Sequence, residues 1–277
     1  MEKPAPLELG KCTTVMLYGV PGAGKTRLLG SGKRTLIIRP PEDHTDSIDA
    51  DNDCEEVVVT DWAEMNEYFE WLQQEGHKEY DWVWLDSISL MQDRLLEDVM
   101  DDVLLRRPDR GIKKGGALVP EFGPDKGEYK LNFDRIAKWI RDMVGIAKAG
   151  AFNFGVTAHP FEWYDPKAEE DVWAPWVQGK NMSPKICGYM NIVAYLEERR
   201  TEKGVQRVLT VDQKGFVGKD QLFCIPELKS GTHGIVEPTM SKLETAINSS
   251  SKRNGSSNGK PARKKAGRKI VRKAKRK

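Results

Sequence analysis

Short runs of apolar and β-branched residues alternate along the chain with longer segments whose apolar residues recur at helical spacing. The short runs predict buried strands over 13–18, 35–38, 57–60, 82–85 and 153–157. The longer segments predict amphipathic helices over 62–75, 88–105, 131–149 and 239–248. Strands that alternate with helices indicate an α/β fold with a mostly parallel sheet.

Two segments break this pattern, and the C-terminal part continues it only weakly. Residues 106–130 mix basic residues with glycine and proline and are expected to form a long mobile basic loop. Residues 160–183 are rich in tryptophan, tyrosine and proline and are expected to be irregular. Residues 190–240 read as shorter strands and turns, among them 192–196 and 207–211.

The glycine-rich segment after the first expected strand carries the clearest chemical signal. It fits GxxxxGK[ST] without a mismatch and lies between a strand and a helix start. Glycines let the backbone wrap a phosphate with inward N–H groups, and the helix N-terminus adds its positive dipole end. The pattern predicts ATP binding, with a lysine that reaches the β- and γ-phosphates and a threonine hydroxyl that ligates Mg²⁺. The segment consists of Gly19, Val20, Pro21, Gly22, Ala23, Gly24, Lys25 and Thr26.

Asp86 directly follows the fourth expected strand, so its carboxylate should emerge beside the phosphates. There it could hold Mg²⁺ directly or through water, as a catalytic partner of Lys25. A second role, as N-cap of the following helix, is compatible with the first.

An ATP hydrolase also needs a group that orients or deprotonates the attacking water. Asp86 is followed by Ser87, not by glutamate, so the next candidates are Glu42 and Asp43 after the second strand. Glu42 is favoured for reach; both are otherwise solvated loop acids. Thr157 and His159 end the fifth strand and could sense the γ-phosphate, although a histidine there could simply bond to backbone.

These motifs together resemble those of the RecA-like P-loop ATPases encoded by phages, some of which act in recombination or single-strand annealing. Tyr18–Thr26, Asp86–Ile88 and Thr157–His159 carry the resemblance, which spans about 12–240. It also covers Glu128–Tyr129, residues 176–180 and the strand 192–196. The resemblance implies a RecA-like core and suggests that the loops after the fourth and fifth strands face single-stranded DNA.

The residues of those two loops support DNA contact in part. Aromatic residues in 160–183 could stack on bases, at roughly 1–3 kcal/mol per base. The same segment carries five acids, and its tryptophans could equally pack in the core or at a protomer interface. The first loop offers five cations for phosphates: Arg106, Arg107, Arg110, Lys113 and Lys114.

The net charge of +2 is the sum of two unlike parts. Residues 252–277 hold 13 basic residues and no acid, which leaves 31 basic and 42 acidic residues in 1–251, a net charge of −11. Residues 249–277 are expected to form a disordered tail after an ATPase domain over 1–248. The tail resembles those of chromatin proteins and predicts sequence-independent binding to nucleic acid. The alternatives are a tail for solubility or RNA binding, or a nuclear localisation signal. Its central cations are Arg263, Lys264, Lys265, Arg268 and Lys269.

Other features narrow the class of protein. No apolar run approaches the length of a membrane span, and the first ten residues show no secretory signal, so no membrane partner is expected. Four scattered cysteines favour a reducing cytoplasm, that of the host if a phage encodes the chain.

The leading hypothesis is a DNA-stimulated ATPase that acts in recombination or annealing, as a homo-oligomer or filament with ATP at the protomer interface. The alternatives are a DNA motor of packaging type, a nucleotide-gated DNA-binding module with negligible hydrolysis and, less favoured, a small-molecule kinase. No residue of the sequence marks an arginine finger.

Overall fold

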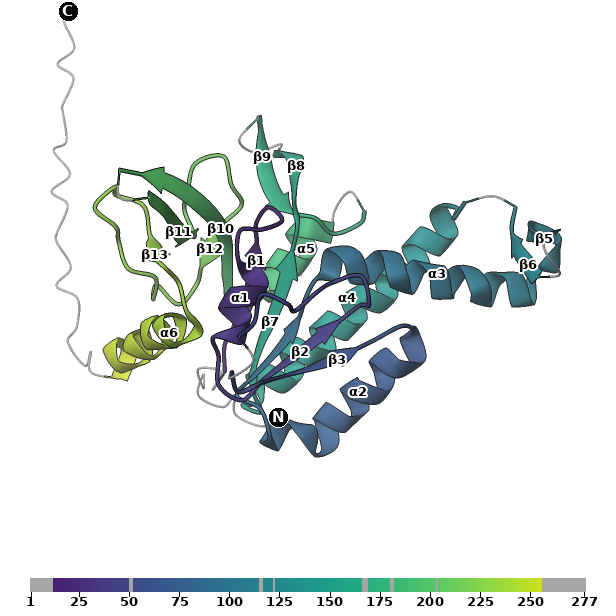
Figure 1. Ribbon diagram of the computed structural model, residues 1–277, viewed down its shortest axis with the longest axis horizontal. Helices are drawn as coiled ribbons and strands as arrows, with labels where there is room; N and C mark the ends of the chain where they lie inside the picture. Colours follow the sequence, from purple (N-terminus) through teal and green to yellow (C-terminus); the bar gives the residue numbers. More distant parts are fainter. Residues whose placement is uncertain are drawn as a thin grey trace, which may run out of the picture.

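The chain forms one large sheet with helices on both faces, as Figure 1 shows for the computed structural model. Six strands run parallel: β1 (Thr14–Tyr18), β2 (Thr35–Arg39), β3 (Cys54–Val58), β4 (Trp82–Leu85), β7 (Asn153–Ala158) and β10 (Ile192–Thr201). Three antiparallel strands extend one edge: β11 (Gly204–Thr210), β12 (Lys219–Asp220) and β13 (Gly234–Val236). The described residues are 12–49, 52–114, 117–121, 123–165, 169–179, 182–202 and 204–255.

Both faces of the central strands β1, β2, β4 and β7 are covered, which explains why these strands are mostly apolar. On β1, Met16 and Tyr18 face one core, whereas Val15 and Leu17 face the other. The first core is covered by α2 (Trp62–Gln74), α3 (Ile88–Arg106), α4 (Lys126–Lys148) and α5 (Met182–Tyr189). The second core is covered by α1 (Lys25–Gly30) and α6 (Met240–Gly255).

The strand order places the chemically interesting residues at one edge. The order is β13-β11-β10-β1-β7-β4-β2-β3, so β7 lies between β1 and β4. Because these strands are parallel, β1, β2, β4 and β7 all end at the same edge of the sheet. The prediction of an α/β fold with a mostly parallel sheet is confirmed, and the arrangement is consistent with a P-loop NTPase fold.

The prediction of a long loop over 106–130 is wrong. A 3-10 turn (Pro108–Arg110) leads into the hairpin of β5 (Gly111–Lys114) and β6 (Ala117–Pro120), and α4 already begins at Lys126. The Asp125 carboxylate caps α4 by accepting hydrogen bonds from the N–H groups of Gly127 and Glu128. We call the described residues from Leu105 to Leu131 the arm, since they project from the body in Figure 1.

The prediction of an irregular segment over 160–183 is also wrong. Residues in it form the antiparallel pair β8 (Pro160–Asp165) and β9 (Glu170–Pro175) and the first residues of α5. Val172 and Ala174 are buried while Trp173 between them is 43% exposed, which is the alternation of a strand with one covered face. The strand expected over 57–60 is β3, which starts three residues earlier and ends two residues earlier, at Cys54–Val58.

Candidate functional site

The segment from Gly19 to Thr26 connects the end of β1 to the start of α1, as its motif predicts. Gly22 and Gly24 have φ of +82° and +94°, a conformation that favours glycine. Lys25 is 7% exposed, and its Nζ donates to the carbonyls of Gly19 at 2.8 Å and Val20 at 3.3 Å. Burial lowers the pKa of Lys25, against the opposing effect of two nearby carboxylates, those of Asp86 and Asp43. The loop therefore holds one partly desolvated cation at its centre.

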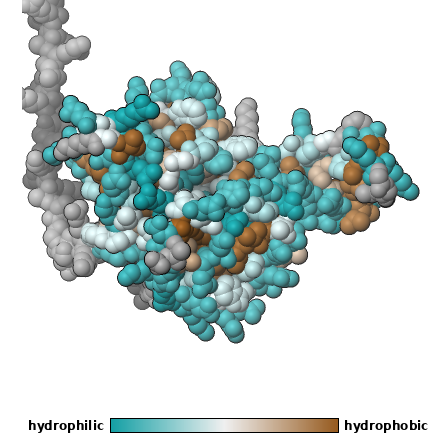
Figure 2. Space-filling view, viewed as in Figure 1, coloured by the Kyte–Doolittle hydropathy of each residue, from teal (hydrophilic) through white to brown (hydrophobic). Residues whose placement is uncertain are grey.

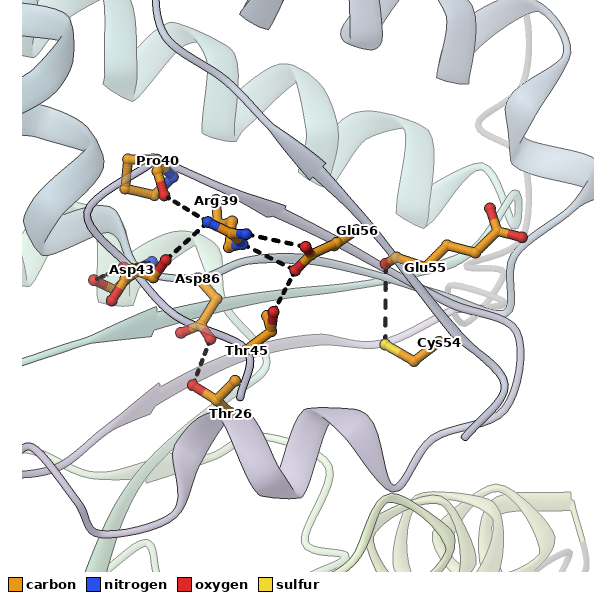
Figure 3. Close-up of polar contacts among 10 residues, drawn as sticks. Thr26, Arg39, Pro40, Asp43, Thr45, Cys54, Glu55, Glu56 and Asp86 are labelled. Atoms are coloured by element: carbon orange, nitrogen blue, oxygen red, sulfur yellow. Dashed lines mark hydrogen bonds and ion pairs between the residues drawn. The ribbon is translucent and has the colours of Figure 1, made fainter. Parts of the chain in front are cut away.

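Asp86 lies immediately after β4, where two threonine hydroxyls donate to its carboxylate. Thr26 Oγ1 lies 2.8 Å from Asp86 Oδ2, and Thr157 Oγ1 from the end of β7 donates to Oδ1. Asp86 is 3% exposed, and this burial raises its pKa, while both hydroxyls and Lys25 act in the opposite direction. Figure 3 shows the Thr26 side chain pointing from α1 to Asp86.

The oxygen atoms of this cluster fit Mg²⁺, which prefers carboxylate, hydroxyl and water oxygens. Thr26 and Asp86 contribute oxygens that already lie side by side at the phosphate-binding loop. These are the two residues that the sequence predicts as metal ligands. No cluster of three or more His, Cys, Asp or Glu side chains suited to a metal occurs among the described residues.

The turn after β2 is held in place by an arginine. Arg39 at the end of β2 donates to both carboxylate oxygens of Glu56 on β3, at 2.9 and 3.0 Å, and to the Asp43 carbonyl at 2.8 Å. Thr45 also donates to Glu56, so both ends of the turn are fixed to β3 (Figure 3). The Glu56 carboxylate raises the pKa of Arg39, which keeps this guanidinium charged.

This turn brings Asp43, rather than Glu42, against the site. Asp43 Oδ2 accepts hydrogen bonds from the Ser87 N–H at 2.7 Å and from Ser87 Oγ at 2.9 Å. Its charge also reaches Lys25 and Asp86, whose pKa values it raises. Glu42 is exposed on the same turn, and its catalytic role stays a prediction. The sequence names both acids but does not show which of the two side chains the turn directs inward.

His159 follows β7 and is held through its backbone. Its N–H donates to Ser89 Oγ at 2.9 Å, and its carbonyl accepts from the Trp176 N–H at 2.6 Å. Ser89 Oγ in turn donates to the Trp176 carbonyl at 2.8 Å, so α3 is joined to the segment after β9. Burial lowers the pKa of His159, and Lys25 lowers it further against Asp43. Both effects favour the neutral imidazole.

The predicted DNA-contacting cations of 106–114 lie on the arm, and they differ in their surroundings. Arg110 is bound by Glu128 and lies 3.4 Å from Asp125, so it ties the hairpin to α4. Arg107 pairs with Asp109 at 3.3 Å. The other three predicted cations have exposed side chains: Arg106, Lys113 and Lys114.

Apolar side chains share the arm with these cations. Leu105 is 82% exposed, Ile112 45%, Leu131 41% and Leu118 39%. Figure 2 shows brown surface at the tip of the arm, among hydrophilic residues. A cluster of this kind is typical of a surface that meets another molecule.

Only some of the remaining predicted contacts with nucleic acid lie among the described residues. Tyr164 on β8 and Trp173 on β9 are 56% and 43% exposed, whereas Trp163 and Trp176 are partly buried. The five tail cations, Arg263, Lys264, Lys265, Arg268 and Lys269, lie outside the described residues. No helix in the described ranges is both long and apolar enough to cross a membrane.

A family model described as an AAA domain matches residues 11–222, well over half of the chain, and includes the loop, Asp86, Thr157 and His159. No curated protein sequence matches the chain.

Proposed function

Since this chain belongs to the AAA domain family, an ATPase-type group of nucleotide-binding domains, we propose that it hydrolyses ATP while bound to DNA, in recombination or single-strand annealing. The observation that carries the proposal is the cluster of Lys25, Thr26 and Asp86 at one edge of the sheet. A cation and a pair of oxygen ligands there are what phosphoryl transfer from ATP requires.

The residues of the site have separable roles in this reaction. The Lys25 ammonium exchanges the loop carbonyls for the β- and γ-phosphates, and the loop N–H groups bind the same phosphates. Thr26 and Asp86 would hold Mg²⁺, and the ion would supply positive charge at the phosphate that is transferred. Asp43 orients the attacking water and accepts its proton, with Ser87 fixing the carboxylate, and Glu42 is the alternative acid.

A single helix supports communication between this site and the arm. The 19-residue α3 begins beside Asp86 and ends at Arg106, a length of about 28 Å at 1.5 Å per residue. DNA that binds the arm would therefore act on the helix whose first turns carry Ser89 and adjoin Ser87. This rigid connection is a physical route by which DNA could stimulate ATP hydrolysis.

The proposed DNA contact is local, because acids outnumber bases in residues 1–251. Arg106, Lys113 and Lys114 on the arm provide phosphate contacts, and Tyr164 and Trp173 provide surfaces for base stacking. The cationic residues of 252–277 add long-range attraction that weakens with salt.

The proposal includes assembly into a homo-oligomer or filament. The exposed Leu105, Ile112 and Leu118 of the arm support it, since a second copy would remove these apolar side chains from water. Light scattering with and without ATP and DNA measures the assembly, and a chain that stays monomeric with both ligands contradicts this part.

The DNA contacts are tested with two matched double variants. Lys113→Ala/Lys114→Ala removes two exposed charges from the arm, and Lys138→Ala/Lys148→Ala removes two exposed charges from the body end of α4. We expect only the arm variant to lose DNA-stimulated turnover, with basal ATP hydrolysis kept in both. Deletion of 252–277 should weaken DNA binding and its salt dependence without changing basal turnover. Equal losses in the two double variants would contradict a role of the arm.

A further inference from the structure

Arg207 on β11 lies against the phosphate-binding loop, although the two are far apart in the sequence. The pairing of β10 with β11 places Arg207 opposite Glu198, at the end of the sheet beside β1. A Cβ atom added at Gly24 would lie 2.8 Å from Arg207 Nε and 3.1 Å from its Cδ. The guanidinium therefore occupies the space in front of Gly24, the residue that precedes Lys25 in the motif.

Nε and Nη2 lie on the same edge of this guanidinium, and only one of the two has a partner in the described structure. Arg207 Nη2 donates to Glu198 Oε1 at 3.1 Å. Arg207 Nε is fully shielded from solvent and has no hydrogen-bond partner among the described residues. Buried donors are nearly always satisfied, and one that is not needs a physical explanation.

The position of the unpaired Nε indicates what would satisfy it. Gly24 belongs to the loop whose backbone surrounds the phosphates of a nucleotide. A guanidinium has its donors in a rigid fork that matches phosphate oxygens and cannot lose its charge at physiological pH. Glu198 accepts from Nη2 and leaves the adjacent Nε, which lies against Gly24, without a partner.

We propose that Arg207 is a nucleotide-binding residue that donates from Nε to the phosphate chain of ATP or ADP bound in the loop of the same chain. Glu198 is its positioning residue. The inference rests on the proposed nucleotide binding and adds to it a cation that no loop motif contains. It also gives the antiparallel pair of β10 and β11 a role in binding the nucleotide.

Arg199 provides a matched control on the same antiparallel pair of strands, β10 and β11. Its side chain is 32% exposed and Arg207's is 31%, and each arginine forms one ion pair with a glutamate of β10. Arg199 bonds to Glu197 and to Gln213 at 2.8 Å and leaves no buried nitrogen unpaired among the described residues. Removal of either arginine thus removes a similar ion pair from these two strands, but of the two only Arg207 lies against Gly24.

The test is titration calorimetry of the full chain with ADP and with a non-hydrolysable ATP analogue, both with Mg²⁺. We expect Arg207→Ala to bind either nucleotide about 10- to 100-fold more weakly, the effect of losing a hydrogen bond to a charged group. Arg199→Ala should stay within threefold of the wild-type affinity. Arg207→Lys keeps the charge without the fork, and an intermediate loss is expected; this variant also serves if Arg207→Ala does not fold.

The outcomes separate this inference from the function on which it rests. In one outcome the wild type binds nucleotide, Lys25→Ala abolishes this binding, and Arg207→Ala and Arg199→Ala bind with equal affinity. That outcome overturns only the role of Arg207. A wild-type chain that binds neither nucleotide overturns the proposed function itself.

Discussion

Thr157→Val is the substitution that isolates how the Asp86 carboxylate is held. Thr157 is fully buried at the end of β7, and its hydroxyl donates to Asp86 Oδ1. Valine has nearly the same shape, so the substitution removes one donor and leaves the packing in place. The carboxylate keeps the hydrogen bond from Thr26 but loses the other one.

The expected magnitude follows from the charge of the acceptor. A hydrogen bond to a charged group contributes about 1.5–3 kcal/mol, so the free energy of unfolding should fall by that amount. Thr35→Val is the matched control, because Thr35 is equally buried but donates to the neutral Lys33 carbonyl at 3.3 Å. Its expected loss is about 0.5–1.5 kcal/mol, the range for a bond between neutral groups.

The same substitution should change the pH dependence of stability and activity. Burial raises the pKa of Asp86 above its ordinary value and the Thr157 hydroxyl lowers it, so Thr157→Val raises the pKa further. A carboxyl with a raised folded-state pKa contributes stability that is lost as pH rises through that pKa. The stability difference between wild type and Thr157→Val should therefore shrink as pH falls. Because Mg²⁺ binding needs ionised Asp86, the acidic limb of ATP hydrolysis should move to higher pH.

Urea titrations at several pH values and a pH profile of ATP turnover measure these effects. An acidic limb at the same pH in Thr157→Val and Thr35→Val would refute the assignment of Asp86 as an ionised metal ligand supported by Thr157. A stability loss equal to that of Thr35→Val would refute the charged nature of the hydrogen bond.

Two further substitutions test the acids and the link between elements. Asp43→Asn removes the proposed general base, so it should lower kcat by about 10²–10⁴ while nucleotide affinity is retained. Glu42→Gln should have little effect on kcat. If steady-state assays show the reverse order, the role belongs to Glu42. Ser89→Ala should lower the free energy of unfolding by about 1–3 kcal/mol, since it leaves the His159 N–H and the Trp176 carbonyl without their partner. It should also reduce DNA stimulation more than basal turnover, and an unchanged ratio of the two would count against signalling through α3.

The parts of the fold that sequence predicts well are those in which one local pattern decides the outcome. The central strands β1, β2, β4 and β7 are mostly apolar because both faces of the sheet are covered there, and the sequence predicts each of them close to its observed place. The motif from Gly19 to Thr26 needs only its own spacing, and Asp86 needs only the end of β4.

The arm and the β8–β9 hairpin could not be predicted in the same way. Short strands that pair only with each other, as β5 does with β6, contain glycine, proline and exposed charged residues. Their sequences therefore lack the apolar pattern that predicts a strand. The start of α4 depends on a capping box between Asp125 and Glu128, and the hairpin is fastened by Arg110, which reaches Glu128 across 18 residues. These contacts became recognisable only in three dimensions.

The side chains that complete the site depend on contacts between distant parts of the chain. Asp43 faces Ser87 because Arg39 and Glu56 fix the turn, and neither belongs to a nucleotide-binding motif. Arg207 reaches Gly24 only through the pairing of β10 with β11 and with β1. No local pattern marks such a residue.

ATP hydrolysis by the full chain, measured with single-stranded DNA, with duplex of the same length and without DNA, tests the central claim most directly. The account predicts turnover that Lys25→Ala abolishes and that single-stranded DNA stimulates more than duplex. Equal or greater stimulation by duplex would indicate a motor instead, and ATP binding without turnover under all three conditions would contradict the proposed ATPase.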